Sequence, residues 1–121
     1  MTQPPIDAAT FGKLVEMTGG DLEFVDELVD TYLQDGASQI AALEAGAAAG
    51  DIDALVRPAH SLKSSSLNLG ALVVGELARG LEEAARTGDA SDAADQVRAI
   101  ADAFAAARTS LANERGQRTR G

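Results

Sequence analysis

The chain of 121 residues carries 19 acidic and 10 basic side chains, and its formal net charge of −9 at pH 7 argues against binding to the phosphates of nucleic acid. It has no cysteine, which excludes disulfides, thiolate zinc sites and cysteine nucleophiles. No apolar stretch approaches the ~20 residues of a membrane span and no basic-then-apolar leader begins the chain, so the sequence predicts one soluble, cytoplasmic domain.

Five helices are predicted in chain order from their capping residues and from the glycines that end them. Ala and Leu dominate, aromatic residues are scarce, and β-branched residues form no alternating run, which favours helices over strands. The first helix is predicted between the Asp7 cap and Gly19–Gly20, the second between the Asp21 cap and Gly50, and the third between the Asp51 cap and Gly70. The fourth is predicted to stop at Gly88.

The second to fifth predicted helices each carry one apolar stripe in steps of three and four residues. The stripe of the second helix consists of Val25, Val29, Tyr32 or Leu33, Gly36, Ile40, Leu43 and Ala47, and that of the third consists of Ile52, Leu55, Ala59, Leu62, Ser66 and Leu69. The stripe of the fourth helix consists of Val73 or Val74, Leu77, Leu81, Ala84 and Ala85, and that of the fifth consists of Val97, Ile100, Phe104, Ala107 and Leu111. This pattern predicts an all-α fold, an antiparallel up-down-up-down four-helix bundle with the short first helix across one end. The domain is predicted to span residues 1–114, before a flexible basic tail over 115–121, and this tail with Met1 favours a free-standing protein.

His60 is the only histidine of the chain and lies on the third predicted helix. At roughly 100° per residue, its side chain points about 130° away from the centre of the apolar stripe, which predicts that it faces solvent. The alternative, a histidine satisfied within the core, fits this register poorly. An imidazole has a substantial neutral, nucleophilic fraction near pH 7, as reversible phosphoryl capture on nitrogen requires.

Lys63 follows His60 by three residues and therefore shares its side of the helix. We expect its ammonium group to stabilise the negative charge of a phosphoryl group on His60, the alternative being a solvated lysine on the flank of the bundle. Ser61, Ser64 and Ser65 are small and are expected to leave access to the ring, and Gly70 ends this stretch.

Val56, Arg57 and Leu67 are candidates for a partner-docking surface around His60. Val56 and Leu67 lie one turn before and two turns after the histidine, where they either face solvent or pack beneath the first helix. Pro58 either kinks the third helix just before His60 or places its start near Arg57.

The run from His60 to Ala71 resembles the signature of histidine-containing phosphotransfer (HPt) domains, roughly His-x-Leu-Lys-Gly-x-x-x-x-x-Gly-Ala. A serine, Ser64, stands where the family usually has glycine. The resemblance extends from about Asp21 to Leu111 and includes Leu77-Ala78-Arg79-Gly80-Leu81-Glu82. The residues that match the signature in register are His60, Leu62, Lys63, Gly70 and Ala71.

This resemblance implies an intermediate of a two-component multistep phosphorelay. His60 would accept a phosphoryl group from a receiver-domain aspartate or a histidine kinase and pass it to the aspartate of a response regulator receiver. The implied partners are therefore receiver domains and a sensor or hybrid histidine kinase. Such a phosphocarrier is not an enzyme with an ATP site, and Mg²⁺ comes with the receiver, so we expect a monomer that binds no cofactor or metal of its own.

Two other functions compete with phosphotransfer. One is a non-phosphorylated helical adaptor that binds and inhibits a receiver or a kinase, but it would not need His60 together with Lys63. The other is an enzyme with His60 as general base, oriented by Glu76, Glu82 or Glu83. We expect these three carboxylates to be solvated at the surface, and a single histidine among scattered carboxylates lacks the spacing of metal ligands.

Overall fold

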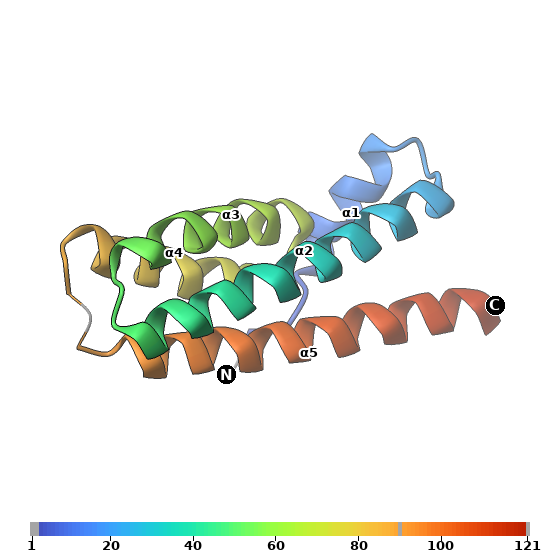
Figure 1. Cartoon of the computed structure of the whole chain (residues 1–121). Helices are drawn as coiled ribbons and strands as arrows, with labels where there is room; N and C mark the ends of the chain where they lie inside the picture. Colours follow the sequence, from blue (N-terminus) through green and yellow to red (C-terminus); the bar gives the residue numbers. More distant parts are fainter. Residues whose placement is uncertain (1–2, 90, 121) are drawn as a thin grey trace.

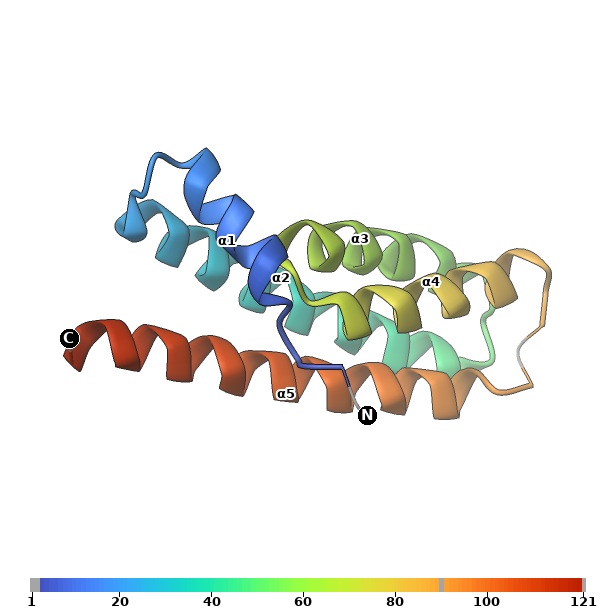
Figure 2. The ribbon, with the colours of Figure 1, turned by 180° about the vertical axis from the view of Figure 1, so that it is seen from behind.

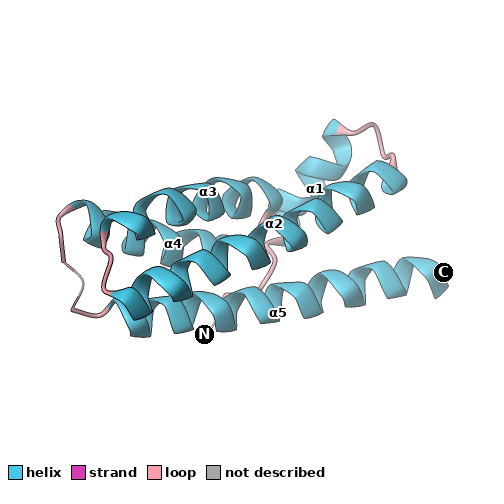
Figure 3. Cartoon of the chain, viewed as in Figure 1, coloured by secondary structure: helices cyan, strands magenta, loops and turns pink. Residues whose placement is uncertain are grey.

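The computed structural model describes residues 3–89 and 91–120, with side chains described as far as Arg115. Within these ranges the chain forms five α-helices and no strand, as Figure 3 shows. The helices are α1 (Ala8–Met17), α2 (Leu22–Ala49), α3 (Asp53–Leu69), α4 (Leu72–Arg86) and α5 (Ala93–Arg120). None of the helices in the described part has the length and apolar character that crossing a bilayer requires.

Helices α2 to α5 form the predicted four-helix bundle, in which each helix packs against the next and α5 closes the ring against α2 (Figure 1). The long helices α2 and α5 extend beyond α3 and α4 at one end of the bundle. The short α1 lies at that end and contacts α2 and α3 (Figure 2). The predicted fold, including the extra N-terminal helix, is therefore confirmed.

Side chains and glycines fix the helix ends largely as the sequence predicts. The Asp7 and Asp21 carboxylates accept hydrogen bonds from backbone N–H groups of the first turns of α1 and α2, at 3.0 and 3.1 Å. Asp51 accepts from the N–H of Ala54 at 3.2 Å. Gly50 and Gly70 adopt left-handed φ angles of 67° and 106° after α2 and α3, a conformation that costs glycine little.

The predicted stripes of α3 and α5 form the core, whereas that of α4 is rotated. The buried residues of α4 are Val74, Gly75, Ala78, Leu81, Glu82 and Ala85, and the predicted members Leu77 and Ala84 are only partly buried. The physical reason is a close approach of α3, because a Cβ atom at Gly75 would overlap the side chain of Leu67. Small residues thus set the phase of α4.

The structure decides between the two starts that the sequence leaves open for the third helix, and it gives the last helix more residues than the sequence predicts. Helix α3 begins at Asp53 and continues through Pro58, which rules out a start near Arg57. Helix α5 continues to Arg120, where the sequence predicts a tail from residue 115. Arg115 lies on α5 and forms ion pairs with Asp26 and Asp30 of α2, at 3.2 and 3.1 Å. These ion pairs link the extended ends of the two helices.

Candidate functional site

His60 lies in the middle of α3 with its side chain 53% exposed, so the predicted exposure is confirmed. Its Nδ1 atom lies 3.0 Å from Oε2 of Glu82 on α4. An ionised carboxylate only accepts hydrogen bonds, so this contact places the hydrogen of a neutral imidazole on Nδ1. The other ring nitrogen, Nε2, then keeps its lone pair and can act as a nucleophile.

Glu82 is the centre of the site, although its side chain is only 6% exposed. Lys63 Nζ lies 2.7 Å from Oε1, and Nη2 and Nε of Arg86 donate to Oε2 at 2.8 and 3.1 Å. Hydrogen bonds from Lys63 foremost, and then from Arg86 and His60, outweigh the opposing effect of burial and lower the Glu82 pKa to about 2. The carboxylate is therefore ionised at neutral pH.

The expectation that Glu82 is solvated at the surface is wrong. The rotated phase of α4 turns this residue toward α3, where three basic side chains offset the cost of burying its charge. Glu76 and Glu83 remain exposed and pair with Arg79, as expected of surface residues. The spacing of the small residues Gly75 and Ala78 before Glu82 is the sequence signal that indicates this inward face.

Lys63 is 22% exposed and bonds to Glu82, so it is not a solvated lysine on the flank of the bundle. Lys63 and His60 reach one carboxylate from successive turns of α3, as their predicted common side requires. Its stabilisation of a phosphoryl group remains a prediction, because its ammonium pairs with Glu82 in this state of the site.

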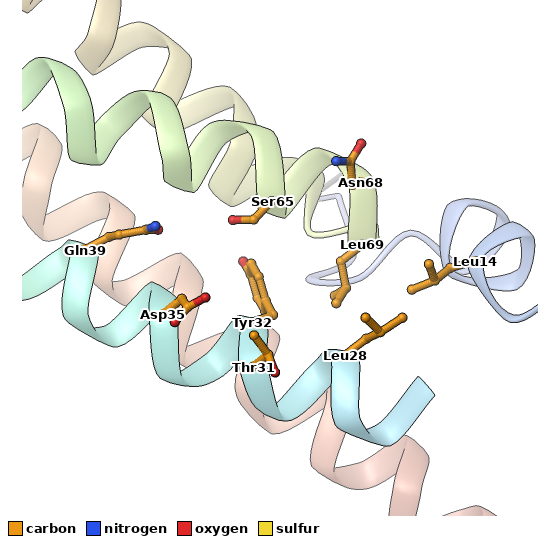
Figure 4. Close-up of a pocket in the computed structure, with 9 residues that line it drawn as sticks. All are labelled: Leu14, Leu28, Thr31, Tyr32, Asp35, Gln39, Ser65, Asn68 and Leu69. Atoms are coloured by element: carbon orange, nitrogen blue, oxygen red, sulfur yellow. The ribbon is translucent and has the colours of Figure 1, made fainter. Parts of the chain in front are cut away.

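Of the four small residues expected around the ring, Ser64 is exposed one turn after His60, and Ser61 is partly buried. Ser65 instead donates to the backbone carbonyls of Ser61 and Leu62, at 3.1 and 3.3 Å. It lines a cleft of about 240 Å³ between α1, α2 and α3, together with Tyr32 and Gln39 (Figure 4).

Gly70 does not lie beside the ring, because ten residues of α-helix separate the two positions by about 15 Å. It instead joins α3 to the segment before α1, where its carbonyl oxygen accepts from the Asp7 N–H at 2.7 Å. A Cβ atom at Gly70 would lie 3.1 Å from the Asp7 carbonyl oxygen, so glycine is needed for this contact as well as for its φ angle.

The three docking candidates differ in exposure. Arg57 is exposed one turn before His60, whereas Val56 is partly buried against the core and Leu67 is partly buried. Leu67 lies over Gly75 of α4, and each of the two apolar residues keeps a part of its surface in solvent. The side chains that can meet a partner around His60 are therefore a cation and two partly covered apolar groups.

The site combines an exposed imidazole with an excess of positive charge. Glu82 carries one negative charge and Lys63 and Arg86 carry one positive charge each, so the cluster has a net charge of +1 while His60 is neutral. Such a cluster suits a ring that takes up an anionic group. Among the described residues, no three His, Cys, Asp or Glu side chains gather as metal ligands would.

Comparisons with known proteins agree with this geometry. The family model of the Hpt domain matches residues 27–110, which contain the whole cluster. The crystal structure of histidine-containing phosphotransfer protein B (HptB) from Pseudomonas aeruginosa PAO1 matches with a TM-score of 0.87 and 30% sequence identity, covering 96% of this chain and 98% of that one. No curated protein shows a significant match. The chain belongs to the Hpt domain family, whose members are phosphocarrier modules, and is a histidine phosphotransfer protein of a phosphorelay.

Proposed function

We propose that His60 is the residue that carries the phosphoryl group, which it accepts from a receiver-domain aspartate or a histidine kinase and passes to a response regulator receiver. The observation that supports this most strongly is the 3.0 Å hydrogen bond from Nδ1 to Glu82 on an exposed ring. It holds the imidazole in the tautomer whose free lone pair lies on Nε2, the nitrogen that faces an incoming phosphorus atom.

The transfer can be written with atoms and charges in balance. The Nε2 lone pair forms a P–N bond to the phosphorus of the receiver's aspartyl phosphate while the P–O bond to the aspartate breaks. The bonding electrons of that P–O bond leave with the aspartate carboxylate. The ring, which still carries its Nδ1 proton, becomes positively charged, and the adjacent Glu82 carboxylate stabilises this charge. The reverse sequence of bonds delivers the group to the next receiver.

Glu82 thereby keeps the phosphoryl group transferable. Because the Nδ1 proton stays on the ring, the group that leaves in the onward transfer is a neutral imidazole rather than an imidazolate anion. A neutral leaving group departs with a smaller build-up of charge, so the bond to phosphorus breaks more readily. Glu82 acts here as a positioning residue, since it touches the ring and not the phosphorus atom.

Lys63 supplies positive charge on the same side of α3 as the ring. A phosphoryl group brings up to two negative charges, and the Lys63 ammonium lies within 2.7 Å of the carboxylate that bonds to His60. We propose that Lys63 stabilises the phosphorylated ring while it holds Glu82 in place. Val56, Arg57 and Leu67 are the proposed contacts with the docked receiver.

The chain works as a monomer in the cytoplasm, has no ATP site, and relies on the receiver for Mg²⁺, which supplies charge stabilisation at the receiver's aspartate. It binds no cofactor of its own. Most of the catalytic groups therefore belong to the partner, and this chain provides the nucleophile, its orientation and local charge.

The test is phosphoryl transfer from a panel of phosphorylated receiver domains, followed by intact mass. We expect the wild-type chain to gain one acid-labile phosphoryl group and His60→Gln to gain none. Both proteins should show the same helical circular dichroism spectrum and the same melting temperature. Phosphorylation of His60→Gln at the wild-type rate would refute the role of His60. Binding of a receiver without any transfer would favour the adaptor function instead.

A further inference from the structure

We infer that Arg86 is a second phosphoryl-binding residue, which exchanges Glu82 for the phosphoryl group when His60 becomes phosphorylated. This inference rests on the proposed function of His60. In the unphosphorylated site, the described hydrogen bonds of the Arg86 side chain all go to Glu82. The inference gives Arg86 a second role, in the phosphorylated state.

The position of Arg86 relative to the ring supports the exchange. Arg86 lies in the last turn of α4, four residues after Glu82. Its Nη2 atom lies 2.8 Å from Oε2 of Glu82, and His60 Nδ1 lies 3.0 Å from the same oxygen atom. The guanidinium and the imidazole therefore contact the same oxygen atom, and in the proposed exchange a rotation of the arginine side chain carries its donors from that oxygen to the group on the ring.

The exposure of the two cations separates their roles. The side chain of Arg86 is 59% exposed, whereas that of Lys63 is 22% exposed. Arg86 therefore has room to change partner, while Lys63 is confined beside Glu82. If Arg86 leaves, Glu82 still accepts from Lys63 and from the His60 Nδ1–H, so the buried carboxylate is not left without a partner.

The charges favour the exchange in the phosphorylated state only. Phosphorylation adds up to two negative charges next to the single negative charge of Glu82, and a dianion attracts the guanidinium more strongly than a monoanion does at a similar distance. A guanidinium has five N–H donors in a planar fork that fits phosphoryl oxygens in pairs. In the free state no dianion is present, so the i,i+4 pair with Glu82 persists.

Arg86→Gln tests this inference, and Arg79→Gln is its matched control. Arg79 lies two turns earlier on α4, is 53% exposed, and pairs with the exposed Glu76 and Glu83. Both variants lose one positive charge from the same helix. We compare the ³¹P NMR titration of phospho-His60 and the equilibrium of phosphoryl exchange with a receiver domain, after circular dichroism has shown that both variants are folded.

We expect Arg86→Gln to raise the pKa of the phosphoryl group above the wild-type value, and to shift the exchange equilibrium away from His60 by about threefold to tenfold. The groups whose charge acts on this titration are His60, Glu82, Lys63 and Arg86. Arg79→Gln should match the wild type in both measurements. Equal effects of the two variants would overturn the exchange, whereas a wild-type chain that is never phosphorylated would refute the proposed function itself.

Discussion

His60 on α3 and Glu82 on α4 are 22 residues apart in the chain, and their side chains meet at 3.0 Å between Nδ1 and Oε2. This contact links the exposed imidazole to a buried, ionised carboxylate. It fixes the tautomer of the ring and joins the two helices that carry the site. The chemistry of His60 therefore depends on the packing of α3 against α4 as well as on the exposure of the ring.

Replacing Glu82 by glutamine tests its role in keeping the phosphoryl group transferable. Glutamine retains a hydrogen-bond acceptor for Nδ1 but lacks the negative charge that stabilises a protonated, phosphorylated ring. We expect Glu82→Gln to lengthen the lifetime of phospho-His60 and to slow onward transfer to a receiver. Both are measured after the donor has been removed, with Glu83→Gln, an exposed neighbour on α4, as the control. The same lifetime in all three proteins would contradict this role.

The low pKa of Glu82 also predicts a dependence of stability on pH. The folded-state pKa of about 2 lies below the ordinary value of 4.5, so the contribution is fully present above pH 4.5 and is lost as the pH falls toward 2. We expect the wild type to exceed Glu82→Gln in free energy of unfolding by roughly 1–3 kcal/mol at pH 7. Urea melts at several pH values should show this difference vanish near pH 2, and a constant difference would contradict the ionisation of Glu82.

Lys63→Ala tests the second charge of the site. The substitution removes the Lys63 ammonium group from beside the phosphorylated ring. We therefore expect a shorter lifetime of phospho-His60 and slower transfer, but not the abolition of phosphorylation. Lys13, the only other lysine of the chain, lies exposed on α1, and Lys13→Ala is the control for a change in net charge. If both variants decay at the wild-type rate, Lys63 has only a structural role.

Leu62→Ala tests the helix phase that exposes His60. Leu62 is fully buried two residues after the histidine, so we expect the substitution to lower the free energy of unfolding by roughly 2–5 kcal/mol. Arg57→Ala, an exposed change on the same helix, should cost far less. A negligible loss for Leu62→Ala in a denaturant melt would mean that the core face of α3 is assigned wrongly.

The sequence predicts the bundle well because its helix boundaries are local. Asp7 and Asp21 bond to N–H groups three residues on, and Gly50 and Gly70 end their helices through φ angles that glycine adopts readily. The exposure of His60 follows from the strong stripe of α3, whose large apolar residues leave a single register. Local chemistry and one clear periodicity are sufficient for these features.

The sequence offers Glu76, Glu82 and Glu83 as carboxylates near His60, but it does not say which of them contacts the ring, because that depends on the phase of α4. Leu77 and Ala84 fit an apolar stripe as well as Ala78 does, and only the close contact of Leu67 with Gly75 selects the phase that turns Glu82 inward. The length of α5 also depends on packing between helices. Arg115 belongs to a basic stretch in sequence, but its bonds to Asp26 and Asp30 depend on the packing of α5 against α2.

The most direct test of the central claim is the position of the phosphoryl group on the histidine ring. The ¹⁵N-labelled chain is phosphorylated by a receiver domain and the ring nitrogens of His60 are observed by long-range ¹H–¹⁵N NMR. We expect the phosphoryl group on Nε2, with Nδ1 still protonated against Glu82. A phosphoryl group on Nδ1, or phosphorylation that leaves the His60 ring unchanged, would contradict the account.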